Sequence, residues 1–257
     1  MNGSNKILKK TRKIKVLNKK KITQNMLRIT FSHEDLSDFP DNERGGYVKF
    51  LFIDNNTKSE LVRPYTIRDF RKKQLELDVD FAIHNEKEGY AAKWASEAKI
   101  GDEIFISGPG PKNLVNFNCN WFFLVGDMSS LPAISINIEA LPENSKGYAV
   151  IEILSENDKQ ILSKPKSFDI HWVVNSDAEN SHKKLLEKIK PLKWYDDNPS
   201  IWVACEFNTM KALRNFFQNE KNINKKNMYI SSYWKIGIDQ EKHKVLKKND
   251  SISWLNE

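Results

Sequence analysis

The chain has 257 residues, of which 39% are hydrophobic and 29% charged, so it can form one large or two modest globular domains and is too apolar to be disordered. No apolar run approaches the length of a membrane span, and the basic N-terminal stretch lacks the apolar segment of a signal peptide. Lys and Arg total 41 against 34 Asp and Glu. The resulting net charge of +7 attracts anions in general without choosing among them.

The first half of the chain predicts short strands separated by turn-forming residues, at 22–31, 46–54, 74–84 and 102–109. One helix is predicted at 89–101, because four apolar residues recur there at helical spacing and Gly101 is placed to cap its end. Several short strands with one helix are typical of a small antiparallel barrel.

The second half alternates strands and helices. Near-continuous apolar strands are predicted at 121–127, 147–154, 168–174, 201–207 and 228–235. A helix follows the first strand, with an N-cap at Ser129 and Ser130 and Pro132 in its first turn, and another opens at Asn208 or Thr209. This alternation predicts a mostly parallel, doubly wound sheet. The fold class is therefore a β-barrel plus an α/β domain, with domains at 1–118 and 119–257.

Several functions are disfavoured by what the chain lacks. The second half has no GxGxxG fingerprint, since its first strand ends in GDMSSLPAI. Cys119 and Cys205 are far apart, so we expect reduced, buried thiols. The triplet 33–35 (His-Glu-Asp) is more typical of a solvated turn than of a metal site. We expect no metal site and no catalytic acid–base pair.

A basic barrel with aromatic residues can bind nucleic acid, and KILKKTRKIKVLNKKK would supply phosphate contacts. However, its basic residues alternate with apolar ones, as on the exposed face of a strand. We keep nucleic-acid binding as the alternative function. A purified protein that carries flavin would exclude a simple nucleic-acid binder.

The stretch RPYTIRDF, residues 63–70, lies between two predicted strands. Its two arginines bracket a tyrosine and a threonine, and the plain interpretation is an exposed strand edge. However, RPYTIR resembles the flavin-binding motif of the ferredoxin-reductase superfamily. Four further segments, in order, resemble the siderophore-interacting protein family of ferric-siderophore reductases: DFAIHNEKEGYAAKWASEAKIGDEIFISGPG, GDMSSLPAISINIEALP, WVACEFNTMKALR and SYWKIG. The resemblance runs from about Val16 to Lys248, and five segments in the right order make it specific.

The resemblance implies a cytoplasmic enzyme that contains FAD and reduces the iron of a ferric siderophore. It makes 1–118 an FAD-binding barrel and 119–257 an NAD(P)H-binding-like reductase domain. Three positions depart from the family pattern: Gly110 and Lys235 stand where relatives usually carry arginine, and Cys205 stands where they carry glycine. The departures at Gly110 and Lys235 bear on how anionic groups of the substrate are held.

Three residues of the opening motif fit the parts of FAD, by analogy with the family. Tyr65 offers a face on which the flavin can stack, Thr66 offers a hydroxyl for its N5 edge, and Arg63 offers a fork of donors for the pyrophosphate. This interpretation competes with that of stray surface residues, and the other segments favour it.

Further cofactor contacts are expected from the resemblance. Asp80 and His84 lie four apart on a strand and so point to one face, which the resemblance places beside the cofactor. A histidine satisfied in the barrel wall is an equal alternative for His84. Backbone N–H groups at Gly89, Ala91 and Ala92 would meet the pyrophosphate at the start of the predicted helix.

The substrate needs cations around an open pocket rather than iron ligands, because siderophore oxygens already hold the Fe(III). We expect Lys49, Lys112 and Lys235 to supply them if they converge, with Arg68 as the next candidate. Each lysine alone is equally consistent with plain surface. A flavoprotein that binds siderophores without reducing them is a further alternative.

The electron donor is expected at the carboxyl ends of the second sheet, where the candidates are Asp127, Ser129 and Glu206. The donor is either NAD(P)H or reduced ferredoxin, whose acidity suits a basic chain. The run DQEKHKVLKKND near the C-terminus is either a solvated helix or a docking patch. We expect a monomer with no nucleic acid and no membrane partner.

Overall fold

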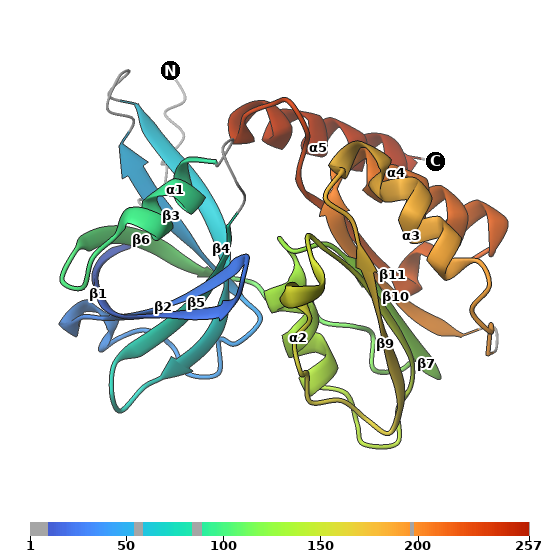
Figure 1. The fold of residues 1–257 in the computed structure, drawn as a ribbon, viewed down its shortest axis with the longest axis horizontal. Helices are drawn as coiled ribbons and strands as arrows, with labels where there is room; N and C mark the ends of the chain where they lie inside the picture. The colour runs from blue at the N-terminus through green and yellow to red at the C-terminus, as the bar shows by residue number, and fades with distance from the viewer. Residues whose placement is uncertain (1–9, 54–58, 84–88, 196–197, 257) are drawn as a thin grey trace, which may run out of the picture. The chain divides into compact units, whose positions relative to one another are not determined.

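The computed structural model describes residues 10–53, 59–83, 89–195 and 198–256. It divides the chain into two compact units. The barrel unit comprises Met1–Ile22 and Met26–Lys112, and the sheet unit comprises Thr23–Asn25 and Asn113–Glu257. Figure 1 shows their elements, the barrel in blue to green and the sheet in green to red.

The barrel unit is a closed barrel with strand order β1-β2-β5-β4-β3-β6. Its strands are β1 (Thr11–Thr23), β2 (Met26–Ser32), β3 (Tyr47–Ile53), β4 (Glu60–Arg71), β5 (Glu76–Ala82) and β6 (Glu103–Gly110), with a short 3-10 turn at Glu34–Leu36. Strands are antiparallel in the pairs β2–β5, β5–β4, β4–β3, β3–β6 and β6–β1. Alternate residues, such as Ile29 and Phe31 or Val48 and Phe50, are fully buried inside. The predicted antiparallel barrel is confirmed.

The sequence places segment 63–70 between two predicted strands. In the structure, this segment lies inside strand β4. It pairs with β3, where Tyr65 faces Val48 and Thr66 faces Tyr47. Pro64 fits there opposite Lys49. The motif therefore sits on a stiff ladder, and its successive side chains point to opposite faces of the barrel wall.

Helix α1 (Tyr90–Glu97) is shorter than predicted. Its C-cap is Ala98, so the predicted cap at Gly101 is wrong: Gly101 lies in the next turn, at φ +95°, and its N–H donates to the Val16 carbonyl over 2.8 Å. Trp94 of α1 stacks on Phe31 of the barrel core, with ring centroids 6.3 Å apart. Through this indole and the buried Ala91 and Ala95, the helix is bound to the barrel.

The sheet unit is a parallel five-stranded sheet with strand order β11-β10-β7-β8-β9. Its strands are β7 (Trp121–Gly126), β8 (Lys146–Ile153), β9 (Ser167–Val174), β10 (Pro199–Glu206) and β11 (Met228–Trp234). Its helices are α2 (Leu131–Glu139), α3 (Ser181–Ile189), α4 (Phe207–Asn215) and α5 (Gln240–Asn256), with short 3-10 turns at Glu156–Asp158, Ala178–Asn180 and Lys225–Asn227 and a π-turn at Phe216–Glu220. The predicted parallel sheet is confirmed.

Helices cover both faces of this sheet, which is why its central strands β7 and β10 are buried along their whole length (Figure 1). Leu185 of α3 and Leu213 of α4 pack into one core with Phe123 and Val203 of the strands. Helix α3 was missed from sequence, because its apolar positions are few and lie among lysines. Helix α2, buried along most of its length, lies on the opposite face from α3 and α4 (Figure 1).

The C-terminal basic run forms part of α5. It is more than a solvated helix, because His243 is buried and its Nε2 lies 2.8 Å from the Ser232 hydroxyl of β11. The ammonium of Lys247 donates to the Ser232 carbonyl over 2.8 Å, and Asp250 binds Arg214 of α4 through two contacts of 2.7 Å. Among the described helices, α5 included, none has the length and apolar character needed to cross a membrane.

Candidate functional site

Tyr65 is held by an aromatic cluster inside the barrel end. Its ring lies 4.4 Å from that of Phe81 and 5.7 Å from that of Phe50, between centroids. The same two phenylalanines lie 6.5 Å and 6.4 Å from Trp94 of α1. One cluster therefore fixes the β4 tyrosine and the α1 helix at the same part of the barrel. Burial raises the pKa of Tyr65 well above its usual value, although Arg63 acts in the opposite direction, so the phenol stays neutral.

Arg63 and Thr66 flank this tyrosine on β4. Both are half-buried, and Arg63 donates from Nη1 to the Val62 carbonyl over 3.0 Å. By strand alternation Arg63 shares the face of Tyr65, and Thr66 points to the other face. Arg63 and Tyr65 can thus contact one ligand from the same face of the strand. The Thr66 hydroxyl can contact that ligand only where it extends past the strand to the other face. Their roles toward FAD stay predictions.

The N-terminus of α1 is open. Its N-cap is Gly89, whose backbone is extended (φ −60°, ψ 151°), and within the described part of the chain no side chain caps the helix. A Cβ added at Gly89 would meet nothing within 4 Å, and Ala91 and Ala92 of the first turn are small and buried. Because the first N–H groups of a helix seek an acceptor and carry positive potential, this end suits a pyrophosphate.

Asp80 lies 5% exposed on the outer face of β5, where its carboxylate is bound by Arg28 of β2. The Arg28 Nε–Asp80 Oδ1 and Nη2–Oδ2 distances are 2.6 and 2.8 Å, a bidentate pair. The cofactor contact of Asp80 stays a prediction, which would need Arg28 or the remaining lone pairs of the carboxylate. His84 lies outside the described residues.

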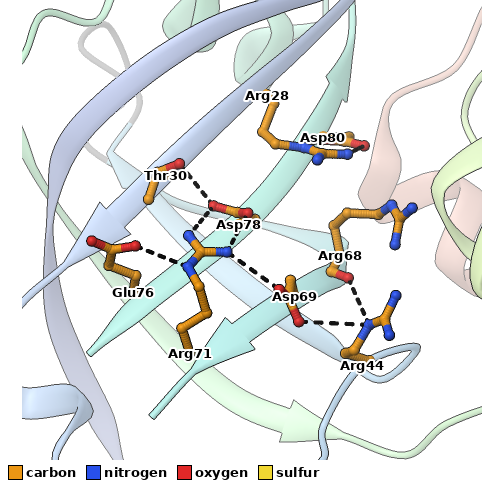
Figure 2. A network of polar contacts seen from close by, with 9 residues as sticks. All are labelled: Arg28, Thr30, Arg44, Arg68, Asp69, Arg71, Glu76, Asp78 and Asp80. Atoms are coloured by element: carbon orange, nitrogen blue, oxygen red, sulfur yellow. Dashed lines mark hydrogen bonds and ion pairs between the residues drawn. The ribbon is translucent and has the colours of Figure 1, made fainter. Parts of the chain in front are cut away.

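Figure 2 shows a second network of polar contacts beside this pair, across β2, β5 and β4. Arg71 binds Asp78 through two contacts of 2.7 and 2.9 Å and Glu76 through one of 2.9 Å. Burial opposes ionisation of Asp78, but the hydrogen bonds from Arg71 and Thr30 outweigh it and lower its pKa. The network favours the ionised form of Asp78 and ties β4, the strand that carries the RPYTIR motif, to its neighbours.

Arg68, the reserve candidate for substrate binding, lies on the same wall. Its carbonyl accepts a hydrogen bond of 3.4 Å from Arg44 Nε, and Arg44 also lies 3.6 Å from Asp69. In Figure 2 the Arg68 guanidinium turns away from Asp69 and Arg71. The Arg68 carbonyl thus ties this part of β4 to Arg44.

The three candidate lysines fall in both units. Lys49 lies on β3 with its Nζ 5.9 Å from the centre of the Tyr47 ring, and Lys112 contacts the Asn42 carbonyl, both within the barrel unit. Lys235, in the sheet unit, donates to Asn208 Oδ1 over 2.9 Å and lies 4.9 Å from the Phe207 ring centre. Their convergence in one pocket stays a prediction.

In the sheet unit, Asp127 follows β7 and is 7% exposed. Its Oδ1 accepts from the N–H and hydroxyl of Ser129, at 2.9 and 2.5 Å. Its Oδ2 accepts from the Glu206 N–H at 3.0 Å and from the Trp234 indole at 2.8 Å. The structure thus brings all three donor-site candidates together at the carboxyl ends of neighbouring strands. Each lies in a hydrogen-bond network that also holds the fold.

Glu206 is 1% exposed and caps α4. Its Oε2 accepts from the N–H groups of Asn208 and Thr209 at 2.6 and 2.9 Å, and its Oε1 lies 3.4 Å from the Ile236 N–H. A pocket of about 290 Å³ opens beside it, lined by Ala178, Glu179, His182, Glu206, Asn208, Thr209 and Ile236. The pocket is available to a ligand, while the helix amides behind it already have their acceptor.

Sequence reasoning missed three residues that shape these sites. Arg28 was missed because only strand register shows that it faces Asp80. Trp234 lies in the SYWKIG segment, and its indole contact with Asp127 spans 107 positions. Tyr47 lies next to two glycines and two residues before Lys49, a spacing that places Tyr47 and Lys49 on one strand face. Cys205 is buried as expected, whereas Cys119 is only half-buried; both are free thiols.

The residues present fit FAD. A closed barrel presents a neutral tyrosine, an arginine on the same strand face and a helix N-terminus with a glycine N-cap, and one aromatic cluster joins the tyrosine to the helix. Together with the parallel sheet, this defines a flavoprotein of the ferredoxin-reductase type. The chain also matches the family model of the siderophore-interacting FAD-binding domain at 15–62 and 55–113, and that of the siderophore-interacting protein at 119–237. It belongs to the siderophore-interacting protein family, and its cofactor is FAD.

Similar proteins agree with this placement. The ferric vibriobactin reductase ViuB of Vibrio cholerae is 31% identical over 243 residues, covering 87% of this chain and 89% of that protein. The ferric acinetobactin reductase of Acinetobacter baumannii is 28% identical over 193 residues, covering 73% and 66%. The structure of the siderophore-interacting protein SipS from Aeromonas hydrophila matches with a TM-score of 0.85 and 27% identity, covering 95% of this chain and 98% of that one. A ferredoxin-NADP+ reductase from Plasmodium falciparum shares the fold, with a TM-score of 0.62 and 19% identity.

Proposed function

We propose that this protein is a ferric-siderophore reductase, which transfers electrons from NAD(P)H or reduced ferredoxin to Fe(III) held in a siderophore. The iron leaves as Fe(II) in the cytoplasm, because Fe(II) binds hard oxygen ligands more weakly than Fe(III) does. Bound FAD supplies the electron-transfer chemistry. The family supports reduction of siderophore iron in general, since two similar proteins carry the names of ferric-siderophore reductases.

The observation that carries this proposal is the shared aromatic cluster of the barrel. Phe50 and Phe81 contact both Tyr65 of β4 and Trp94 of α1. A rigid cluster of this kind keeps the stacking face and the anion-binding helix end at a constant separation. Binding and orienting the cofactor is then the main task of the barrel residues, because outer-sphere electron transfer does not require a side chain to move a proton.

The substrate is expected to meet cations rather than iron ligands. Within the described residues, the one cluster of potential metal ligands is His33, Glu34 and Asp35, in which the His33 ring accepts the Asp35 N–H and so serves as a helix cap. Lys49, Lys112, Lys235 and Arg68 are proposed to bind the anionic groups of the siderophore. Lysine acts as a flexible point charge, so several siderophores of different shape could be accommodated.

The sheet unit bears on the electron donor. Asp127 and Glu206 place carboxylates at the helix starts where a dinucleotide phosphate is bound in many α/β proteins. A phosphate there would have to displace a buried carboxylate or approach it closely. This favours a protein donor, or an NAD(P)H whose phosphates bind elsewhere. Both donors therefore remain in the proposal.

The test is an anaerobic turnover assay with an Fe(II)-specific chelator as trap. Purified protein loaded with FAD is mixed with a ferric siderophore and, in separate reactions, with NADH, NADPH or chemically reduced ferredoxin. Formation of the Fe(II)–chelator complex that depends on both protein and donor is the expected result.

Controls separate the alternatives. Protein without FAD and donor without protein should give only background Fe(II). Quenching of protein fluorescence by the ferric siderophore, with no Fe(II) from any of the three donors, would show a siderophore-binding flavoprotein that does not reduce. Failure of binding as well would remove the siderophore from the proposal altogether.

A further inference from the structure

A second feature of the barrel unit is a pocket at the end of β6. Its volume is about 230 Å³, and it is lined by Lys10, Tyr47, Lys49, Ser107, Gly108, Pro109 and Gly110. Sites that enclose a whole drug-sized ligand run to roughly 300–1,000 Å³. This pocket is therefore of a size for one arm of a larger ligand. Among the residues that line it are two lysines and no carboxylate.

Gly110 makes this pocket possible. Tyr47 pairs with Gly110 across β3 and β6, and a Cβ added at Gly110 would lie 2.1 to 2.5 Å from ring atoms of Tyr47. The Tyr47 ring thus lies directly over the glycine, in space that any side chain at position 110 would need. Gly110 has no left-handed φ, so the requirement for glycine there is the ring and not the backbone.

Lys49 and Ser107 complete the aromatic wall. They pair across the same two strands, and strand alternation places Lys49 on the Tyr47 side, because Val48 and Phe50 point into the core. The Lys49 ammonium lies 5.9 Å from the centre of the Tyr47 ring, within the range of a cation–π contact. A flat ring, an ammonium and a hydroxyl therefore line one small space.

The end of β6 that lines this pocket is held by a buried arginine. Arg12 is 6% exposed and donates from Nη1 to the Gly108 carbonyl over 2.8 Å. It also binds Asp38 over 2.9 Å and lies 5.3 Å from the centre of the Phe39 ring. The pocket is thus built on a rigid base.

We propose that this pocket binds the aromatic ring of a catecholate arm, and that Tyr47 makes the enzyme favour catecholate over hydroxamate siderophores. An aryl ring can stack on Tyr47, and its anionic oxygens can then approach Lys49. An aliphatic hydroxamate offers no ring for that face, and neutral hydroxamate complexes offer less charge. This inference rests on the proposed function, because it specifies the class of siderophore that the reductase accepts.

Binding is measured with gallium(III) complexes, which cannot be reduced and so report recognition alone. Three probes are titrated calorimetrically into FAD-loaded protein: an anionic tris-catecholate, an anionic α-hydroxycarboxylate chelate without rings, and a neutral tris-hydroxamate. The variants are Tyr47→Leu, Tyr47→Phe and Gly110→Ala. Gly110→Ala leaves the tyrosine in place but puts a methyl group where its ring lies.

Tyr47→Leu and Gly110→Ala should each weaken the catecholate complex by about 2- to 10-fold, the range of one aromatic stacking contact. Both should bind the other two probes like the wild type, and Tyr47→Phe should bind all three like the wild type. Circular dichroism and flavin content confirm that each variant is folded. Equal weakening of both anionic probes would overturn the proposal in favour of charge alone, and unchanged catecholate binding in both variants would also overturn it.

Failure of the proposed function has a different signature. If wild-type protein binds the gallium tris-catecholate through Tyr47 but forms no Fe(II) with any donor, the pocket stands and the reductase does not. If it reduces ferric catecholates while the Tyr47 and Gly110 variants bind every probe normally, the reductase stands and the pocket does not.

Discussion

Helix α1 of the barrel unit and helix α4 of the sheet unit begin in opposite ways. In the barrel unit, α1 starts at Gly89 with no side-chain cap and open space where a Cβ would lie. In the sheet unit, α4 starts beneath the buried carboxylate of Glu206, and Asp127 takes the amide of Ser129 just before α2. An anion is stabilised at either kind of end, but only the first leaves that place to a ligand.

This difference teaches where each unit obtains its stability. In the sheet unit, the Glu206 carboxylate satisfies the first amides of α4, so this helix start needs no phosphate. The barrel unit leaves one helix end to be satisfied by water or by a cofactor, so part of its stability comes with FAD binding. This contrast between the starts of α1 and α4 can be tested by substitutions, given below in order of decreasing expected effect.

Glu206→Ala should lower the free energy of unfolding by about 2–4 kcal/mol, because it removes a helix cap and leaves buried N–H groups of α4 unsatisfied. Urea denaturation followed by circular dichroism measures this loss. Glu206→Gln, which keeps one side-chain acceptor, should lose clearly less. A Glu206→Ala protein that unfolds at the wild-type urea concentration would show that the carboxylate is held for a ligand rather than for α4.

Arg63→Ala should leave the barrel folded and weaken FAD binding about 10- to 100-fold, corresponding to a lost charge-assisted contact of roughly 1.5–3 kcal/mol. Titration of apoprotein with FAD, followed by quenching of flavin fluorescence, gives the affinity. Arg63→Lys retains the charge without the fork and should fall between the two. Wild-type affinity in the alanine variant would assign Arg63 to the surface and leave the α1 end as the main phosphate site.

Lys49→Ala, Lys112→Ala and Lys235→Ala should each weaken binding of an anionic ferric siderophore by about 0.5–1 kcal/mol at low salt, since these cations are partly solvated. The losses should shrink as salt is raised, because screening already weakens the wild-type contact. Calorimetric titrations with an anionic and a neutral complex, at two salt concentrations, measure this. An effect confined to Lys49 and Lys112 would assign substrate binding to the barrel unit alone.

Gly89→Asp converts the open end of α1 into a capped one. The new carboxylate should raise the stability of the apoprotein by a few tenths of a kcal/mol and weaken FAD binding about two- to fivefold. Gly89→Asn, a neutral cap of the same shape, separates charge from geometry and should weaken FAD less. Unchanged FAD affinity in the aspartate variant would mean that the pyrophosphate is bound away from this helix end.

The sequence by itself determined the two kinds of fold. Alternating and near-continuous apolar runs report how many faces of a strand are buried, so the antiparallel barrel and the parallel sheet were both predicted correctly. Helical spacing predicted the start of α1, whereas the RPYTIR motif was identified only by its resemblance to a known family. Helix α3 was missed because its few apolar residues lie among lysines. The end of α1 was misplaced at Gly101, because the helix already ends at Glu97 with Ala98 as its C-cap.

Tertiary structure alone decided which of those polar residues already have partners. Asp80 faces Arg28 and Asp127 faces Trp234 because strand register and sheet order bring residues 52 and 107 positions apart into contact. No local pattern encodes such pairs, since they depend on which strands become neighbours. The same register lays the Tyr47 ring over Gly110. In the sequence, the glycine at this position shows only that a side chain is missing. In the folded barrel, its missing side chain leaves the space that the aromatic ring occupies.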